Sequence, residues 1–206
     1  QKTGRSYVQY EIFGGGSGGR SGKDGVSGTN VKQSNARIAP VEIKESEFAV
    51  RTRRIELLRD TGGPGKFRGG LGFVREYELL DHEVRFSLRS TKHTVAPKGI
   101  DAGLPGKTGY CVINPGTAKE RVLPSRCSDL TLLPGDIVRL ETPGGGGLGG
   151  AFERDPEMVL RDVRNGYVSI EKAAESYGVV INVESGDFLL DHALTEEKRN
   201  KSRHVH

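Results

Sequence analysis

Residues 14–28 read GGGSGGRSGKDGVSG, and eight of these fifteen residues are glycine. Two further clusters follow: GGPGKFRGGLG at 62–72 has six glycines in eleven residues, and GGGGLGG at 144–150 has six in seven. Glycine loses more conformational freedom on folding than any other residue, so this density indicates backbone that approaches something closely. Apolar, strand-like segments flank the clusters, which distinguishes them from a flexible linker. The clusters therefore predict ordered loops on a β scaffold, with main-chain amides available to form a site.

The segments between the clusters alternate apolar and polar residues, as half-buried strands do. In the first segment, residues 7–13, Val8, Tyr10 and Ile12 share the predicted buried face. The further predicted strands are 48–58, 71–80, 83–89, 110–113 and 137–142. Turn residues separate these strands at short intervals, which predicts a mainly β fold, an antiparallel sandwich or barrel, over residues 1–150.

After residue 150 the pattern becomes helical. Asp155 followed by Pro156 is typical of a helix start, and Ser169 predicts the cap of a second helix. We expect residues 151–183 to form a helical hairpin and a final strand packed on the β domain, which makes the protein α+β overall. Residues 184–206 are expected to be a polar tail, charged and frayed from about residue 191.

Composition narrows the class of protein. The chain has 31 Lys and Arg against 27 Asp and Glu, a net charge of +4 that is mixed along the sequence. This balance argues against a nucleic-acid partner, which usually requires a concentrated basic surface. No apolar stretch of membrane-spanning length and no signal peptide appears, so we expect no membrane partner. Cys111 and Cys127 have neither zinc-site spacing nor a disulfide framework, and are expected to be free thiols in the cytoplasm.

Two matches to nucleotide-binding motifs do not hold. Gly14, Gly16 and Gly19 fit G-x-G-x-x-G, but the following SGKDGVSG cannot begin the helix that a dinucleotide site requires. Gly106-Lys107-Thr108 resembles the end of a phosphate-binding loop, but that motif needs glycine at position 101, which is Asp101. Neither match predicts a nucleotide site.

The first glycine cluster carries the strongest candidate site. Its amides, together with the guanidinium of Arg20, form a plausible cradle for an anion, because oriented N–H groups need no reorganisation. The alternative is a tight loop in which Arg20 pairs with Asp24. Arg89 and His93 flank a predicted strand end. They are expected to bind an anion or to orient a proton-transfer group, and the alternative is that both are structural. The full set of anion- or substrate-binding candidates is Gly15, Gly16, Gly18, Gly19, Arg20, Asp24, Arg89 and His93. No cluster has the ligand count of a metal site.

Several stretches together resemble the C-terminal part of the hydantoinase B family. They are Tyr10-Glu11 leading into the first cluster, RRIELLRDTGGPGKFRGGLGFVREYELL, AGLPGKTG, LLPGDIVRLETPGGGGLGG and ERDPEMVLRDVRNGYVSIEKAAESYGVVI. They run in the family's order over roughly residues 7–183. The family comprises the B-type subunits of ATP-dependent N-methylhydantoinase and 5-oxoprolinase, and the corresponding alpha subunits of acetone and acetophenone carboxylase.

The resemblance implies an enzyme of more than one subunit. ATP and Mg are held by an A-type subunit, which phosphorylates the substrate, and opening of a cyclic amide is completed on the B-type subunit. The family's divalent metal ligands lie in the N-terminal part of the B-type subunit. This chain is therefore expected to bind no metal or ATP itself, to be an incomplete catalyst, and to act in a hetero-oligomer with both partners. It is expected to be a cleaved fragment or a separately encoded subunit.

The resemblance also assigns roles and leaves alternatives. The first glycine cluster is expected to face the active site, where Arg20 binds a phosphate or carboxylate that develops during the reaction. The other two clusters are expected to form close-packed turns at the subunit interface. Two other functions remain open: part of a biotin-independent, ATP-dependent ketone carboxylase, and a non-catalytic structural subunit.

Overall fold

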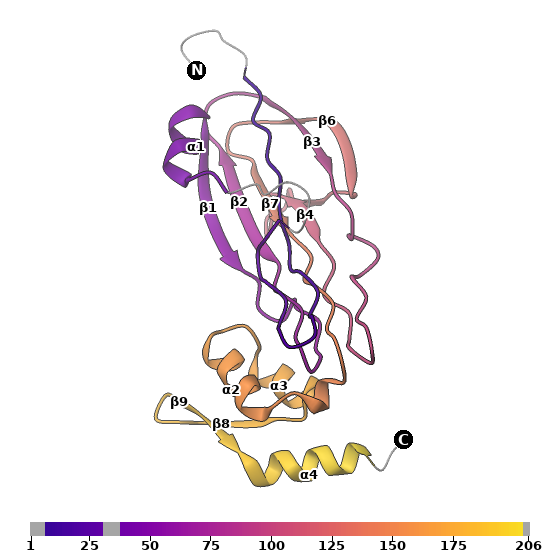
Figure 1. Ribbon diagram of the computed structural model, residues 1–206. Helices are drawn as coiled ribbons and strands as arrows, with labels where there is room; N and C mark the ends of the chain where they lie inside the picture. Colours follow the sequence, from indigo (N-terminus) through magenta and orange to yellow (C-terminus); the bar gives the residue numbers. More distant parts are fainter. Residues whose placement is uncertain (1–6, 31–37, 204–206) are drawn as a thin grey trace.

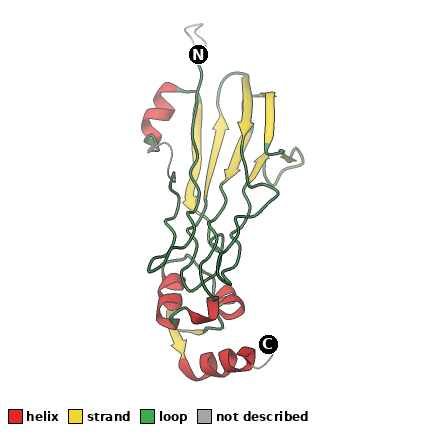
Figure 2. Ribbon diagram, turned by 45° about the vertical axis from the view of Figure 1, so that its right-hand side comes forward, coloured by secondary structure: helices red, strands yellow, loops and turns green. Residues whose placement is uncertain are grey.

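A computed structural model describes residues 7–30 and 38–203, and the molecule is elongated (Figure 1). The main strands lie at one end, helices α2, α3 and α4 lie at the other, and long loops connect the two ends (Figure 2). The glycine clusters are in these loops, so they link the two ends of the molecule rather than extend the strands.

Two antiparallel sheets form the upper end. The larger has the strand order β1-β2-β7-β4-β5, and the smaller pairs β3 with β6. The bounds are β1 Val50–Leu57, β2 Phe73–Leu79, β3 Val84–Arg89, β4 Tyr110–Ile113, β5 Arg121–Val122, β6 Arg126–Leu132 and β7 Ile137–Glu141. Helix α1, Val41–Glu47, precedes β1 and packs beside it. The strands predicted over 48–58, 71–80, 83–89, 110–113 and 137–142 are confirmed as β1, β2, β3, β4 and β7.

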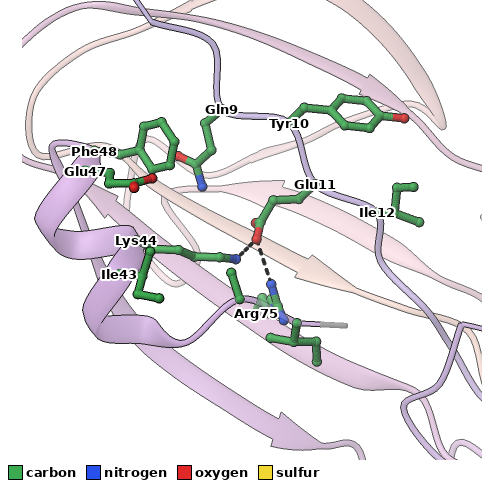
Figure 3. Close-up of a pocket in the computed structure, with 11 residues that line it drawn as sticks. Gln9, Tyr10, Glu11, Ile12, Ile43, Lys44, Glu47, Phe48 and Arg75 are labelled. Carbon is green, nitrogen blue, oxygen red and sulfur yellow. Dashed lines mark hydrogen bonds and ion pairs between the residues drawn. The ribbon is translucent and has the colours of Figure 1, made fainter. Parts of the chain in front are cut away.

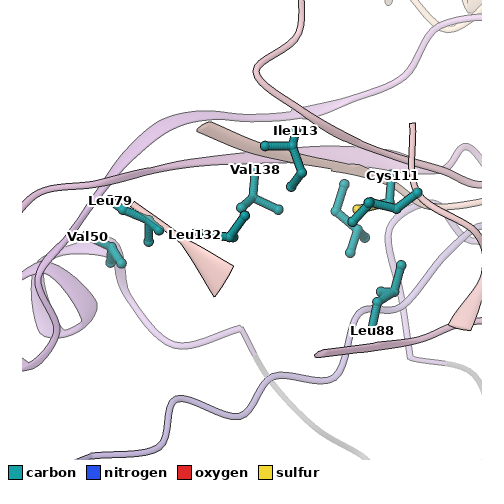
Figure 4. Packing of buried hydrophobic residues seen from close by; sticks show 9 residues of the cluster. Val50, Leu79, Leu88, Cys111, Ile113, Leu132 and Val138 are labelled. Atoms are coloured by element: carbon teal, nitrogen blue, oxygen red, sulfur yellow. The ribbon is translucent and has the colours of Figure 1, made fainter. Parts of the chain in front are cut away.

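The two sheets share one hydrophobic core. Leu88 and Leu132 of the smaller sheet pack with Leu79 and Val138 of the larger one (Figure 4). In β7, burial alternates along the strand, as expected when one face covers a core. The mainly β, sandwich-like architecture predicted from the sequence is confirmed.

Both cysteines belong to this core and are free thiols. Cys111 is fully buried, and burial followed by the nearby Cys127 raises its pKa to about 12. Cys111 therefore behaves as a small apolar side chain rather than as a nucleophile.

The glycine clusters pack on one another through their backbones. The Gly16 N–H donates to the Pro143 carbonyl at 2.9 Å, and the Gly19 N–H donates to the Gly146 carbonyl at 2.9 Å. Donors and acceptors are thus three residues apart on both segments. Three residues is the repeat of the polyproline II helix, which has no internal hydrogen bonds and leaves its backbone groups for neighbours. The first and third clusters are therefore hydrogen-bonded side by side in extended form.

Close approach explains why these positions are glycine. A Cβ on Gly145 would lie 1.9 Å from the Ser17 carbonyl oxygen, and one on Gly16 would lie 1.9 Å from that of Gly70. The close packing expected of the second and third clusters is confirmed, and the neighbours in the described residues are other segments of the same chain. Their place at a subunit interface stays a prediction.

The lower end forms a second, smaller hydrophobic cluster. It contains Val159 and Leu160 of α2, Ala173 of α3 and Ile181 of β8, together with Tyr177. The elements are the 3₁₀ turn η1 Ala151–Glu153, α2 Pro156–Arg164, α3 Ile170–Ser176, β8 Val180–Glu184, β9 Asp187–Asp191 and α4 His192–Arg203.

Both predicted helix caps are confirmed. The Asp155 carboxylate accepts the Glu157 N–H at 2.9 Å, and the Ser169 hydroxyl accepts the Lys172 N–H at 3.1 Å. The prediction of a frayed tail from about residue 191 is wrong for the residues that the structure describes, since His192–Arg203 form α4, which follows β9 directly. The Thr195 hydroxyl accepts the Val180 N–H at 3.0 Å, which attaches α4 to β8.

The strand predicted over residues 7–13 is also wrong. The segment is extended but belongs to neither sheet, and the predicted buried side chains of Val8, Tyr10 and Ile12 are 88%, 81% and 46% exposed. The opposite set, which includes Glu11 and Phe13, faces the protein. The alternation is real, but polar contacts of Glu11 rather than apolar burial select the inner face.

Replacing Asp155 with alanine is expected to lower the free energy of unfolding by about 1 kcal/mol, because α2 loses the acceptor for one of its free N–H groups. Asp155→Asn retains an acceptor at the same position and serves as the control. Urea denaturation of the three proteins measures the difference, and equal losses for both variants would contradict the capping role.

Candidate functional site

Most of the backbone amides predicted to bind an anion already donate hydrogen bonds to carbonyls of the same chain. The N–H groups of Gly15, Gly16 and Gly19 donate to the backbone carbonyls of Thr29, Pro143 and Gly146 at 3.1, 2.9 and 2.9 Å. These three amides are therefore committed to holding the fold together. The Gly18 amide makes no such bond among the described residues, and Gly18 is exposed.

Arg20 begins a tight turn whose tip is formed by Ser21 and Gly22. Its N–H and carbonyl exchange hydrogen bonds with those of Lys23 at 2.9 and 3.0 Å, and Gly22 takes a φ of 79° between them. Positive φ is readily adopted by glycine, which explains glycine at this position. Arg20 is exposed to solvent at the start of this turn.

Asp24 pairs with Arg154 instead of Arg20. Its two carboxylate oxygens accept from Nη1 and Nη2 of Arg154, both at 2.7 Å. The pairing of Arg20 with Asp24, expected as the alternative to a site, is therefore wrong. Burial opposes ionisation of Asp24, but the hydrogen bonds and charge of Arg154 outweigh it and hold the pKa of Asp24 below its ordinary value.

Arg154 extends this pair into a buried ionic cluster. Its Nη2 donates to Asp162 at 2.7 Å, and Asp162 also accepts from Nε of Arg68 at 3.1 Å. The side chain of Arg154 is 0% exposed, and those of Arg68 and Asp162 are 5% and 6% exposed. The cluster joins the first and second glycine clusters to helix α2, so Asp24 has a structural role.

Arg89 and His93 are not brought to the first glycine cluster by any hydrogen bond or ion pair in the described residues. Arg89 ends β3, exposed and opposite Arg126 of β6. His93 is half-buried beside Gly109, and burial lowers its pKa. No hydrogen bond or ion pair among the described residues joins all eight candidates, and their shared site stays a prediction.

The structure contains instead a cavity of about 280 Å³ that the sequence did not predict. It lies between the extended segment 9–12 and helix α1, against the face of β2 that also carries Tyr77 and Leu79 (Figure 3). Glu11, Lys44 and Arg75 meet at this cavity, from the extended segment, α1 and β2 respectively (Figure 3).

Glu11 is the anion at the centre of this group. It forms an ion pair with Lys44, accepts from Nη1 of Arg75 at 3.0 Å, and accepts from the Tyr77 hydroxyl at 2.8 Å. The Lys44 ammonium also donates to the Tyr77 hydroxyl at 3.0 Å. Burial, and then the charge of Arg75, lower the pKa of Lys44 to about 8. Two cations therefore share one carboxylate.

Arg75 is the most deeply buried member. Its side chain is 2% exposed, and its guanidinium lies over the rings of Phe13 and Phe73, 5.1 and 5.4 Å from their centroids. Its Nε and Nη2 atoms are buried and have no hydrogen-bond partner in the described part of the chain. Buried donors without acceptors are rare and costly, so this edge of Arg75 requires an explanation.

Sequence reasoning missed this cavity for identifiable reasons. The alternation over 7–13 placed Glu11 on the outer face, although Glu11 faces inward. Lys44 lies in VEIKESE, a short, polar, seven-residue helix with no side-chain cap. Arg75 in the middle of the strand sequence FVREYEL was the one available signal, because a charged residue between apolar strand residues needs a partner.

Comparison with known proteins identifies the class. The chain belongs to the hydantoinase B/oxoprolinase family, whose model matches residues 1–151. It is 39% identical over 176 residues to the B-type subunit of a putative D-/L-hydantoinase from Pseudomonas sp. (strain NS671), a match that covers 85% of this chain and 30% of that protein. The chain thus spans about a third of the length of this relative. The family resemblance found in the sequence is confirmed.

Two solved structures share the fold. The crystal structure of ATP-dependent caprolactamase from Pseudomonas jessenii matches with a TM-score of 0.75 and 29% identity, over 90% of this chain and 32% of that chain. A nucleotide-free acetone carboxylase structure matches with a TM-score of 0.77 and 21% identity, over 93% of this chain and 30% of that chain. The second likeness concerns the fold alone.

Two features are absent from residues 7–30 and 38–203. None of the helices there has the length and apolar character that crossing a bilayer requires. In the same residues, no three His, Cys, Asp or Glu side chains lie together as a set of metal ligands.

Proposed function

We propose that this chain supplies the C-terminal portion of the B-type subunit of an ATP-dependent cyclic-amide hydrolase. The likeness to ATP-dependent caprolactamase, at 29% identity over 90% of this chain, carries the proposal. In the proposed enzyme, an A-type subunit holds ATP and Mg and activates the substrate. The remaining part of the B-type subunit holds the divalent metal. The chain acts in the resulting hetero-oligomer.

The experiment is to isolate the chain with the polypeptides that assemble with it and to measure ATP-coupled ring opening. Caprolactam, 5-oxoproline and hydantoin are the substrates, and mass spectrometry identifies the associated chains. The expected result is ring opening of a cyclic amide with release of ADP and without bicarbonate. ATP hydrolysis that requires both a ketone and bicarbonate would overturn the proposal in favour of a carboxylase.

Arg20 is the residue of this chain that we propose binds an anion in the assembled enzyme. Two features support it: Arg20 is exposed at one end of a hydrogen-bonded turn, and the nearby Gly18 amide has no backbone acceptor in the described residues. An exposed guanidinium and an amide without a backbone acceptor suit a phosphate or carboxylate.

Replacing Arg20 with alanine is expected to lower ATP-coupled turnover by about tenfold or more, since charge-assisted hydrogen bonds contribute about 1.5–3 kcal/mol. Lys23→Ala, at the other end of the same turn, is the matched control. Both variants are expected to keep the wild-type melting temperature and assembly. Equal turnover of the two variants, or a loss of assembly in place of turnover, would favour a structural role.

A further inference from the structure

We propose that the outer face of the smaller sheet binds a phosphoryl group, held between Arg89 of β3 and Arg126 of β6. The ligand is a tetrahedral dianion, either inorganic phosphate or a phosphate monoester. This inference stands apart from the proposed catalytic function, because it rests on one cross-strand pair of this chain. The two strands pair at the end of the molecule that carries the main strands (Figure 1).

The register of the two strands places the arginines directly opposite one another. The Ser90 N–H donates to the Ser125 carbonyl at 2.8 Å, so the neighbouring pair is a hydrogen-bonded one. Hydrogen-bonded and non-hydrogen-bonded pairs alternate along an antiparallel ladder, and Arg89 and Arg126 therefore form a non-hydrogen-bonded pair. Side chains in such a pair leave the same face of the sheet with their Cβ atoms about 4.5–5.5 Å apart.

The charge of this pair is not compensated within the described residues. Arg89 and Arg126 are both exposed, and neither has an ion pair or a side-chain hydrogen bond there. The carboxylates of Glu83 and Asp129 lie beside Arg85 instead, 3.6 and 3.5 Å from its Nε and Nη1. Like charges directly opposite one another destabilise a strand pair, so an anion bound between the arginines is stabilising.

Two hydroxyl groups extend the same face. The register shifts between Phe86 and Leu88, and both Ser87 of β3 and Ser128 of β6 are exposed. Each serine is two residues from its arginine, and alternate residues of a strand share a face. The Ser87 oxygen accepts the Asp129 N–H at 3.1 Å, which leaves its hydroxyl proton free to donate. The face therefore presents two guanidinium groups and two hydroxyl donors.

This set of donors suits a phosphoryl group better than a carboxylate. A phosphate monoester carries a charge of about −1.5 to −2 at pH 7 and has three strong acceptor oxygens. It can therefore neutralise both arginines and accept paired N–H donors from each of them. A single carboxylate carries one negative charge and leaves one arginine uncompensated. We expect the face to select a dianion over a monoanion.

Two sources supply this chemistry: a free phosphate or small phosphate ester, or a phosphorylated side chain of a neighbouring polypeptide. Both present the same oxygens to the arginines. The experiment therefore has one arm that tests phosphate binding and a second arm that identifies the source.

In the first arm, sodium phosphate is titrated into the 206-residue chain. Sodium chloride is the ionic-strength control and sodium acetate the monoanion control. NMR follows the Nε resonances of Arg89 and Arg126, and thermal denaturation measures the melting temperature. We expect phosphate to shift both resonances saturably and to raise the melting temperature, because a ligand of the folded state stabilises it. Resonances that move no further with phosphate than with chloride or acetate overturn the proposal.

Variants locate the binding. Arg89→Met and Arg126→Met are each expected to weaken phosphate binding by about tenfold or more, because the ligand loses charge-assisted hydrogen bonds. Arg121→Met is the matched control and is expected to bind as wild type. Arg121 is also exposed and has no ion pair in the described part of the chain, but it lies on β5 of the larger sheet. Equal affinities of the three variants would contradict the site.

Arg126→Glu tests the cross-strand pair itself. It is expected to abolish phosphate binding and to raise the melting temperature in phosphate-free buffer, because opposite charges across a strand pair are stabilising. A higher melting temperature also shows that the variant folds. Phosphate binding that survives this change, or a melting temperature that does not rise, counts against the proposal.

The second arm repeats the phosphate titration on the chain isolated with its associated polypeptides. Retained binding identifies a free phosphate or phosphate ester as the ligand. Loss of binding in the assembly, together with a phosphorylated residue found by mass spectrometry in an associated polypeptide, identifies a phosphorylated side chain. Loss of binding without any phosphorylated residue shows that another kind of surface covers this face, and it overturns the proposal.

Discussion

Replacing Gly145 with alanine is expected to prevent stable folding of the chain. The new Cβ would lie 1.9 Å from the Ser17 carbonyl oxygen, 2.3 Å from the Ser17 carbonyl carbon and 2.8 Å from the Gly18 nitrogen. All three atoms are backbone, so no side-chain rotation relieves the contact. The segments must separate, and that movement breaks hydrogen bonds such as those from Gly145 to Gly70 and from Gly63 to Gly145, at 2.9 and 2.8 Å.

We expect a loss of about 4 kcal/mol or more, which is exceptional for a single methyl group and is a large share of a typical domain's stability. Gly18→Ala is the matched control from the first cluster, because the nearest atom to its added Cβ is 3.7 Å away. That change is expected to be neutral or stabilising by about 0.4–1 kcal/mol, since it restricts the unfolded chain. Thermal and urea denaturation compare the two, and a Gly145 variant as stable as the Gly18 variant would refute the close-packing account.

Replacing Arg154 with methionine is expected to lower the free energy of unfolding by about 3–5 kcal/mol. The change removes the buried cation between Asp24 and Asp162 and leaves the first carboxylate without its bidentate partner. Arg53→Met is the control: Arg53 is 44% exposed and pairs with Glu78 at 3.1 Å, and such a surface pair contributes less than about 1 kcal/mol. Urea denaturation at neutral pH measures both, and similar losses would contradict the role of the buried cluster.

The same variant has a predictable pH dependence. The pKa of Asp24 is lower in the folded protein than its ordinary value of 3.8, so its contribution to stability is present above that value. The contribution is lost as the pH falls through the folded-state pKa. We therefore expect the stability difference between wild type and Arg154→Met to shrink as the pH is lowered below about 4. A difference that stays constant would show that Arg154 acts through packing rather than charge.

Local pattern was sufficient for β1, β2, β3, β4 and β7 and for two of the helices, but it missed β5, β6 and β9. Alternation predicted five strands, and α2 and α3 carry their own start signals in Asp155 and Ser169. Helix α4 also has a cap, since the Asp191 carboxylate accepts the Leu194 N–H at 3.0 Å, but its charged sequence has no apolar pattern that predicts a packed helix. Contacts with distant residues hold it. Arg199 donates to the carbonyl of Tyr177 at 3.1 Å and to that of Arg154 at 2.8 Å. Contacts between residues far apart in the sequence do not appear in a local pattern.

The candidate site was less predictable than the fold. Glycine density correctly indicated close approach, but the sequence does not say whether a backbone approaches a ligand or another backbone. Here Gly15, Gly16 and Gly19 approach other segments of the chain. The pairing of Asp24 was missed for the same reason, since its partner Arg154 is 130 residues away in the sequence. Residue type alone specifies neither how closely two backbone segments approach nor which charged side chains form a pair.

The glycine region also has a consequence for how the chain folds. Its hydrogen bonds join segments near residues 16, 63, 70, 104 and 145, and most of them connect different parts of the sequence. Each segment alone lacks a side-chain core and has no internal ladder, so long loops must close before any bond forms. Glycine adds a large entropy loss to that step. The region is therefore expected to form late and all at once, and the chain to fold slowly for its size.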